Sequence, residues 1–236
     1  MLPEKLRAIF RREAPPVAVS ARPATNSTPP PRGALALRKP ARREPPAMRS
    51  SRGLEQFFFS IRDVVGLSVL DCAGASQDNI NYLIDLGHKV YSQDLVRSIE
   101  EAFGPDMANQ TNPGQIESFL KQNFDYPPAT FDGVLLWDAL QFMSPPLLAA
   151  TVDRLYDVMR PGAYLLAFFT AAERATEVPS YSFRIVDNKT ISVTDRGLRP
   201  TGQVFNNRTL ERLFGKFESV KFFLTRENLR EVIVRR

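Results

Sequence analysis

The sequence predicts an α/β domain with a mostly parallel sheet of seven strands, helices on both faces and an antiparallel hairpin at its carboxyl end. Two observations lead to this fold. From Gly53 onward, short apolar runs typical of buried strands alternate with segments whose apolar residues recur at helical spacing. Such alternation favours right-handed crossovers and a parallel sheet. The last two predicted strands are joined by a short polar turn, which is typical of antiparallel pairing.

The first half of the domain supplies three of the expected strands. Apolar runs predict them over Leu67–Asp71, Lys89–Ser92 and Ile116–Leu120. Helices are expected over Leu54–Ile61 and Leu95–Phe103, and a further helix that Gly87 ends is indicated by the spacing of Ile80, Leu83 and Ile84.

The second half supplies the other four strands. Two are expected over Gly133–Trp137 and Tyr164–Thr170, and two more over Ser219–Leu224 and Glu231–Val234. Helices are expected over Leu147–Met159 and Thr209–Phe214. An additional hairpin is predicted from Ser182–Val186 and Thr190–Val193, outside the seven-stranded sheet.

Residues 1–52 have a different composition and are expected to form a disordered, basic tail ahead of a domain at 53–236. They hold 10 of the 19 prolines, and 12 Lys or Arg against 3 Asp or Glu, a charge of +9. The rest of the chain holds 19 Lys or Arg and 23 Asp or Glu, a charge of −4, so the positive charge of the whole chain, +5, comes from the tail. A segment with so few large apolar residues cannot bury enough surface to offset its ordering entropy.

The tail is open to three interpretations. We favour a solvated extension without a dedicated partner. A weak anionic partner, such as nucleic acid or lipid headgroups, is the second interpretation, although the sequence has no specific nucleic-acid motif. An organelle transit peptide is the third, and Glu4, Glu13 and Glu44 count against it.

The rarity of cysteine and histidine excludes several kinds of site. With one cysteine, Cys72, and one histidine, His88, the chain lacks ligands for a Cys/His metal cluster, so no metal site is expected. A serine or cysteine hydrolase would need His88 as its base, but that residue lies in a predicted helix-to-strand turn, where we expect it to be solvated. No apolar stretch reaches the 18 or more residues of a membrane-spanning helix, and we expect a cytoplasmic protein.

A ligand site is indicated where the first two strands end. The first strand runs into Asp71-Cys72-Ala73-Gly74-Ala75-Ser76, a turn of small residues that a ligand can approach closely. The second ends before Asp94, and an acid at that place can accept both hydrogen bonds from a ribose diol. In open parallel sheets, ligands lie beyond the carboxyl ends of the strands.

In this order the segments resemble the class I S-adenosylmethionine-dependent methyltransferases, a Rossmann-like family. Val69-Leu70-Asp71 with its small-residue turn is similar to the family's first motif, and the strand leading to Asp94 is similar to its second. Phe131 to Leu140 resembles the fourth strand and its turn, and Met159-Arg160-Pro161-Gly162 resembles the break before the fifth strand. The resemblance covers about residues 54–236.

The resemblance implies S-adenosylmethionine as cofactor and a set of residues that contact it. Asp71 would order the turn and help to hold the methionine end, Asp94 would bind the ribose, and Asn123 and Phe124 would lie near adenine. The full set implied is Asp71, Ala73, Gly74, Ala75, Ser76, Asp94, Leu95, Asn123, Phe124 and Trp137. Simpler roles stay open, namely backbone capping for the two acids and core packing for Phe124 and Trp137.

The turn departs from the family pattern because Ala73, Ala75 and Gln77 stand where glycines are usual. An alanine forced into a left-handed conformation would be strained by about 1–2 kcal/mol. Two functions therefore compete: a methyltransferase with an altered turn, which we favour, and a non-catalytic interaction or regulatory module that has lost the cofactor. A NAD-type or nucleotide-sugar enzyme ranks last, since the turn lacks a full Gly-x-Gly-x-x-Gly pattern.

Methyl transfer suits a chain that is poor in histidine. The leaving thioether is neutral and needs no proton, so placement of the reactants supplies much of the acceleration. If the acceptor must lose a proton, Asp138 at the end of the fourth strand is the candidate base. We expect a small-molecule acceptor. Tyr181, Phe183, Arg184 and Arg199, in the segment from 171 to 203, could bind an anionic or aromatic one, or could belong to an ordinary solvated hairpin.

Overall fold

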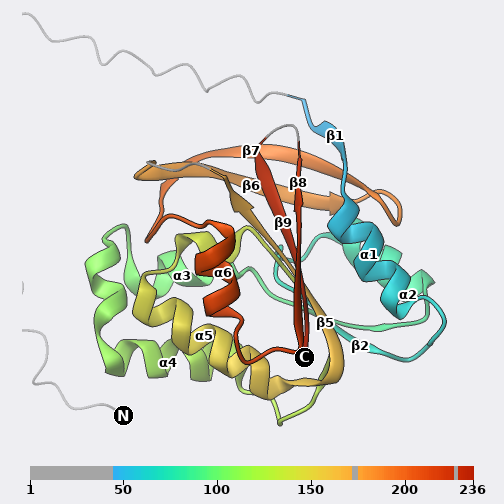
Figure 1. The fold of residues 1–236 in the computed structure, drawn as a ribbon, viewed down its shortest axis with the longest axis horizontal. Coiled ribbons are helices and arrows are strands. Elements are labelled where there is room, and N and C mark those ends of the chain that lie inside the picture. Colours follow the sequence, from blue (N-terminus) through green and yellow to red (C-terminus); the bar gives the residue numbers. More distant parts are fainter. Residues whose placement is uncertain (1–44, 172–174, 226–227) are drawn as a thin grey trace, which may run out of the picture. The chain divides into compact units, whose positions relative to one another are not determined.

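The computed structural model describes residues 45–171, 175–225 and 228–236. Most of the predicted tail lies outside these residues. The predicted fold class is confirmed: a mostly parallel sheet carries helices on both faces and ends in an antiparallel hairpin (Figure 1). None of the described helices is long and apolar enough to cross a membrane.

The central sheet has six strands in the order β3-β2-β4-β5-β9-β8. The first four are parallel to one another, and β9 runs antiparallel to both β5 and β8. Their bounds are β2 (Ser68–Asp71), β3 (Lys89–Ser92), β4 (Phe131–Trp137), β5 (Met159–Thr170), β8 (Ser219–Leu224) and β9 (Leu229–Arg235).

Helices cover both faces of this sheet. In Figure 1, α1 (Arg52–Ile61) and α2 (Gln77–Asp85) lie on one side of it, and α3 (Leu95–Phe103), α4 (Pro113–Phe124), α5 (Pro145–Val158) and α6 (Asn207–Leu213) on the other. Two short 3₁₀ helices, η2 (Met107–Thr111) and η3 (Ala139–Phe142), lie in the connections.

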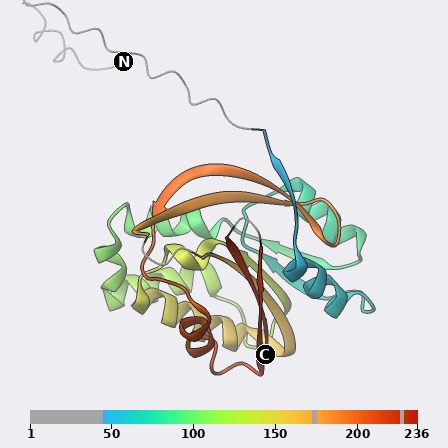
Figure 2. The same cartoon turned by 45° about the horizontal axis from the view of Figure 1, so that its top comes forward.

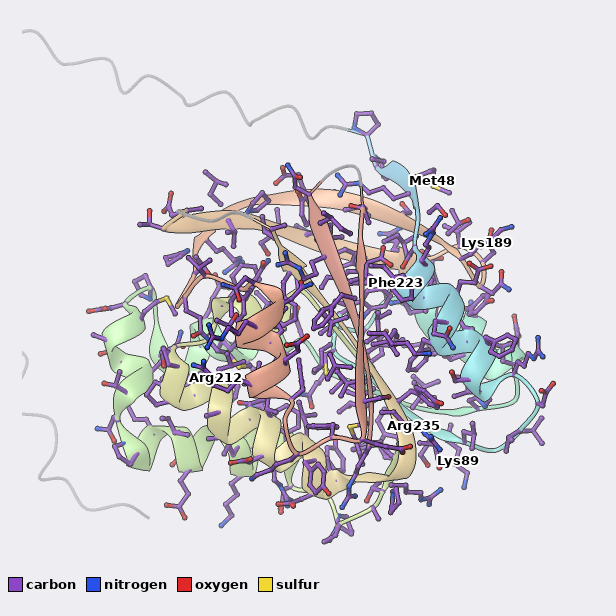
Figure 3. All side chains as sticks on the ribbon, in the orientation of Figure 1. Met48, Lys89, Lys189, Arg212, Phe223 and Arg235 are labelled. Atoms are coloured by element: carbon purple, nitrogen blue, oxygen red, sulfur yellow. The ribbon has the colours of Figure 1, made fainter. Side chains whose placement is uncertain are left out.

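Alternation along the strands produces two cores, one on each face. On β4, Val134 and Leu136 belong to the core under α3–α6, whereas Leu135 and Trp137 belong to the core under α1 and α2. This is the pattern that successive side chains of a strand buried on both faces must give. Phe223 of β8 packs against the second core and lies between that strand and α1 (Figure 3).

A second, three-stranded sheet arches over the carboxyl end of the central sheet (Figure 2). It consists of β1 (Ala47–Ser50), β7 (Thr190–Pro200) and β6 (Glu177–Ile185), paired antiparallel in the order β1-β7-β6. The hairpin predicted from Ser182–Val186 and Thr190–Val193 is therefore present, with longer arms than expected. We call this three-stranded sheet the roof.

Three expectations need correction. The third predicted strand, Ile116–Leu120, lies inside helix α4, so the central sheet has six strands rather than seven. The predicted tail extended to residue 52, but Ala47–Ser50 form strand β1, because backbone pairing with β7 does not require apolar side chains. His88 is buried rather than solvated, and burial lowers the pKa of its imidazole.

Candidate functional site

The candidate site lies at the carboxyl end of β2, where the strand order reverses. From β2 the chain continues to β3 on one side, and β4 then pairs with the other side of β2. Open α/β sheets bind ligands at this kind of switch point. Here a cavity of 370 Å³, which we call the central cavity, is lined by residues after β2 (Cys72, Ala73), at the end of β4 (Trp137, Asp138), from α3 and from the roof.

Two further cavities share walls with the central cavity. The turn cavity, of 470 Å³, lies over residues 73–78 and shares Ala73, Asp94, Ser182 and Arg196 with it. The hairpin cavity, of 420 Å³, lies between α3, η2 and the far end of the roof hairpin, and shares Val96, Glu100, Arg196 and Arg199 with the central cavity. The three cavities therefore form one cleft between the central sheet and the roof.

The turn after β2 is folded without backbone strain at its alanines. Gly74 has a φ of +88°, whereas neither Ala73 nor Ala75 has a positive φ. A Cβ on Gly74 would also stand 3.2 Å from Oδ2 of Asp94. The one position that needs glycine thus has it, and the alanines that depart from the family pattern impose no left-handed strain.

The same turn is held against the end of β3 by main-chain pairing. The amide of Gly74 donates to the carbonyl of Gln93 at 2.9 Å, and Ser92 Oγ donates to the carbonyl of Gly74 at 2.9 Å. Ala73 and Asp94 form an antiparallel bridge. Gln77 does not fill the cleft with its side-chain amide, which donates to Asn81 Oδ1 along α2.

Asp71 holds the turn in place through hydrogen bonds and lines none of the three cavities. Its Oδ1 accepts from the indole Nε1 of Trp137 at 2.6 Å and from the amide of Ala73 at 3.1 Å, and its Oδ2 accepts from Asn79 Nδ2 at 2.9 Å. Burial raises the pKa of the Asp71 carboxyl, and these three hydrogen bonds act in the opposite direction. The carboxylate is thus satisfied by the protein itself.

Asp94 is placed for a different role because it lines the cleft and only one of its two carboxylate oxygens accepts a hydrogen bond from the described residues. Its Oδ1 caps α3 by accepting from the amide of Arg97 at 3.0 Å. Its Oδ2 lies beside Gly74, and none of the described residues donates a hydrogen bond to it. Asp94 lines both the central and the turn cavities. Leu95, the next residue, is fully buried in the core instead.

Trp137 closes the floor of the central cavity in an unusual backbone conformation. Its φ is +53°, at an irregularity in the pairing of β4 with β5. Bulky residues rarely adopt a positive φ, and such outliers concentrate at functional sites. The indole stacks on Phe183 of the roof, with ring centroids 5.2 Å apart and an interplanar angle of 10°.

Asp138, which follows Trp137, is a fully buried carboxyl group on the wall of the central cavity. Its Oδ2 accepts from the amide of Tyr181 at 2.8 Å. Burial raises the pKa of Asp138 to about 7, although the Tyr181 amide and the charge of Arg199 lower it. A carboxyl group with a pKa near neutrality can both take and release a proton at physiological pH.

Side chains from the central layer also hold the free edge of β6. Gln141 Nε2 donates to the carbonyl of Pro179, Asp138 accepts from the amide of Tyr181, and Asn79 contacts the backbone of Phe183 and Ile185. These bonds fall on alternate residues, 179 to 185, which share one edge of the strand. The roof is thereby fixed over the cleft along most of β6.

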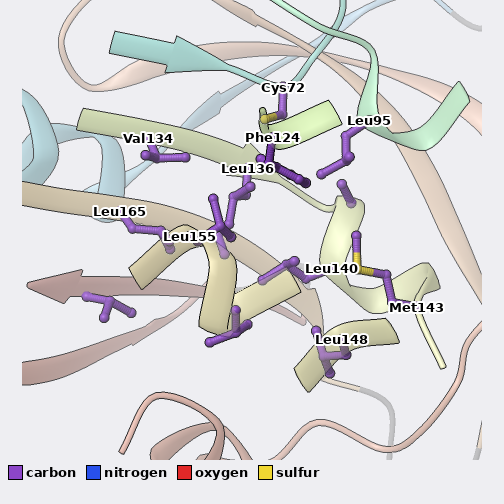
Figure 4. Packing of buried hydrophobic residues seen from close by; sticks show 14 of the residues in the cluster. Cys72, Leu95, Phe124, Val134, Leu136, Leu140, Met143, Leu148, Leu155 and Leu165 are labelled. Atoms are coloured by element: carbon purple, nitrogen blue, oxygen red, sulfur yellow. The ribbon is translucent and has the colours of Figure 1, made fainter. Parts of the chain in front are cut away.

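The two residues expected near adenine are not in the cleft. Phe124 is fully buried in the core, near Leu136, Leu95 and Cys72 in Figure 4. Asn123 donates through Nδ2 to the carbonyl of Phe119, inside the same helix. They were expected to follow a strand, whereas they end helix α4, so the carboxyl edge of the sheet does not include them.

Most of the other residues named from the sequence lie together at the cleft. Ala73, Gly74, Ala75, Ser76, Asp94, Trp137 and Asp138 line the cleft, as do Tyr181, Phe183, Arg184 and Arg199 from the roof. Sequence reasoning missed Asn79 and Arg196. The position of Asn79 in a helix gives no signal of its contact with a strand a hundred residues later, and Arg196 is one of many exposed arginines.

Comparisons with known proteins show a distant likeness to solved structures. No protein family model matches the chain, and no curated protein matches it. The chain is similar to the 1,6-didemethyltoxoflavin N1-methyltransferase of Burkholderia thailandensis, with 13% identity over 78% of this chain and 76% of that chain, at a TM-score of 0.44. It is similar to a SAM-dependent methyltransferase from Methanosarcina mazei, with 16% identity, coverage of 73% and 93%, and a TM-score of 0.43. It is also similar to a SAM-dependent methyltransferase from Archaeoglobus fulgidus, with 12% identity over 78% of this chain and 91% of that chain, at a TM-score of 0.46.

Proposed function

We propose that this chain is an S-adenosylmethionine-dependent methyltransferase that acts on a small-molecule acceptor. The observation that carries the proposal is the cleft at the switch point, where the turn after β2 meets Asp94, a cavity-lining acid whose Oδ2 accepts no hydrogen bond from the described residues. The central cavity, at 370 Å³, falls within the range of about 300–1,000 Å³ that is typical of small-ligand sites.

The residues of the cleft suit the chemical groups of this cofactor. Asp94 would accept hydrogen bonds from the ribose diol through Oδ2, beside the backbone of Ala73 and Gly74. The ring of Trp137 and the carboxyl of Asp138 would face the cationic groups of the cofactor, since aromatic faces and carboxylates attract positive charge. Arg97, on the α3 side of the same cavity, carries the charge that a carboxylate needs.

The chain's own contribution to the reaction is placement, exclusion of water and control of one proton. When bound, S-adenosylmethionine supplies a methyl group on a positively charged sulfur that leaves as a neutral thioether. The roof, fixed along β6, limits water over the central cavity, which strengthens electrostatic interactions inside it. Asp138 would receive the proton that an acceptor hydroxyl or amine gives up, because its pKa of about 7 suits a general base at neutral pH.

Calorimetric titration with S-adenosylmethionine and S-adenosylhomocysteine tests the proposal. We expect binding by the wild type and an affinity lower by about tenfold or more for Asp94→Asn, the effect of losing a charged hydrogen bond. Asparagine caps helices as well as aspartate does, so the variant should fold normally.

The matched control is Asp106→Asn, which changes the N-cap of η2 outside the proposed cofactor site. It should bind like the wild type. Absence of heat and of any thermal shift at millimolar ligand would refute the enzymatic function and leave the alternative, a non-catalytic module that has lost the cofactor.

A further inference from the structure

The hairpin cavity differs chemically from the cofactor part of the cleft. Its apolar lining consists mainly of Val96, Ile99, Met107, Phe142, Leu198 and Pro200. Gln110 and Glu177 add polar groups to it. It adjoins the central cavity along a wall formed by Arg196 and Arg199 together with Val96 and Glu100. A compound lying there would meet an apolar chamber at one end and, at the other, two guanidinium groups of which Arg199 is paired with Glu100.

The two arginines reach the same space because the strand is irregular between them. Side chains three positions apart on a regular strand point to opposite faces. Gly197, which lies between the arginines, has a φ of +95°, and its amide donates to Oδ1 of Asp195 at 2.6 Å. The pairing of β6 with β7 shifts register at this place, opposite Ser180. The bulge turns both guanidinium groups toward the cleft.

The positive charge of this wall is only partly neutralised by the protein. Arg199 pairs with Glu100 on α3, but its Nε is buried and has no hydrogen-bond partner among the described residues. Arg196 lines all three cavities and forms no ion pair with the described acidic side chains. A buried donor without a partner is costly, and an anionic ligand would satisfy it.

We propose that the methyl acceptor is an apolar small molecule bearing an anionic group, held with its apolar body in the hairpin cavity and its anionic group on Arg196 and Arg199. This inference rests on the proposed function and names the substrate class of the same cleft. Because Asp138 lies on the central cavity that these arginines also line, the accepting atom would extend past them toward the cofactor. A planar guanidinium can bind a carboxylate or phosphate through two parallel hydrogen bonds, which gives the site its selectivity.

A pair of probes that differ in charge but not in shape tests this inference. We would titrate 2-naphthoate and 2-naphthamide into the full chain, with and without saturating S-adenosylhomocysteine, and follow binding by calorimetry. The wild type should bind naphthoate at least tenfold more tightly than naphthamide. Arg196→Met and Arg199→Met should each lose that preference while still binding naphthamide.

Arg208→Met on the exposed surface of α6 is the matched control, because it removes the same charge away from the cleft. It should keep the wild-type preference. Equal affinity for the two probes, or an unchanged preference in both cleft variants, would overturn the inference.

Cofactor titration of the same proteins separates this inference from the proposed function. If naphthoate discrimination is present but S-adenosylhomocysteine does not bind, the proposed function fails while the anion site stands. If Arg196→Met instead weakens S-adenosylhomocysteine and leaves the naphthoate preference intact, the arginine serves the cofactor and the inference is wrong.

Discussion

Replacing Asp138 with asparagine should make the protein more stable at neutral pH while removing the proposed base. The carboxyl is fully buried, and its pKa is raised from the ordinary value of 3.8 to about 7, chiefly by burial. The amide of asparagine has nearly the same shape and keeps an oxygen that can accept from the Tyr181 amide. It cannot ionise, so it avoids the cost of a buried negative charge.

The sign and size of the effect follow from the difference between the folded and unfolded pKa. Between pH 3.8 and about 7, the folded protein keeps a proton on Asp138 that the unfolded chain has released. Stability from this group is therefore lost as pH rises through that window. Each pKa unit corresponds to about 1.36 kcal/mol, so the free energy of unfolding should fall by about 4 kcal/mol across the full window.

Urea denaturation of wild type and Asp138→Asn from pH 4 to pH 9 measures this effect. The variant's advantage in free energy of unfolding should grow with pH until about pH 7 and then stay constant. Burial also raises the pKa of Asp71 and Glu231, but both proteins contain these acids, so subtraction removes their contribution. Asp85→Asn, at an exposed acid, controls for the loss of one charge. A pH-independent difference between Asp138→Asn and wild type would refute the reasoning.

Two further substitutions test how the roof is held and shaped. Asn79→Ala should lower the free energy of unfolding by about 3 kcal/mol, because the Asp71 carboxylate and the buried amide of Ile185 would each lose a hydrogen-bond partner. A loss below about 1 kcal/mol, measured by urea denaturation, would contradict this. Gly197→Ala should cost about 1–2 kcal/mol and also abolish the preference for naphthoate, because alanine disfavours the left-handed bulge. Gly66→Ala, at another glycine with a positive φ outside the cleft, should lower the free energy of unfolding by a similar amount and keep the preference for naphthoate. If both glycine variants kept that preference, the bulge would not orient the arginines.

The alternation of strands and helices could be predicted because the local spacing of apolar residues indicates each element. Ser219–Leu224 forms β8 with the predicted bounds, and helix α5 ends before Arg160-Pro161-Gly162 as expected. The prediction of the third strand was wrong because the five residues Ile116–Leu120 are too few to show the helical spacing of the longer segment. Ile116, Phe119 and Phe124 are buried at helical spacing, and α4 begins at Asn112-Pro113, where the Asn112 side chain caps the first turn.

The part of the site that consists of strand ends could be predicted best. The carboxyl ends of parallel strands meet at one edge, so Asp94 and Asp138 could be expected in one cleft. The contribution of the roof could be predicted only in part, through Tyr181, Phe183, Arg184 and Arg199. Arg196 lines the cleft because of a bulge, and Asn79 contacts β6 through long-range packing, and neither leaves a local pattern in the sequence.

The side-chain bonds along β6 have a consequence for how copies of this chain can meet. A sheet edge with unpaired backbone groups is a template onto which a strand of another molecule can add. Gln141, Asp138 and Asn79 occupy those groups on β6. The opposite edge is β1, which is only four residues long and carries Arg49. Short, charged edges resist strand addition, so we expect this sheet to be protected against intermolecular β-aggregation.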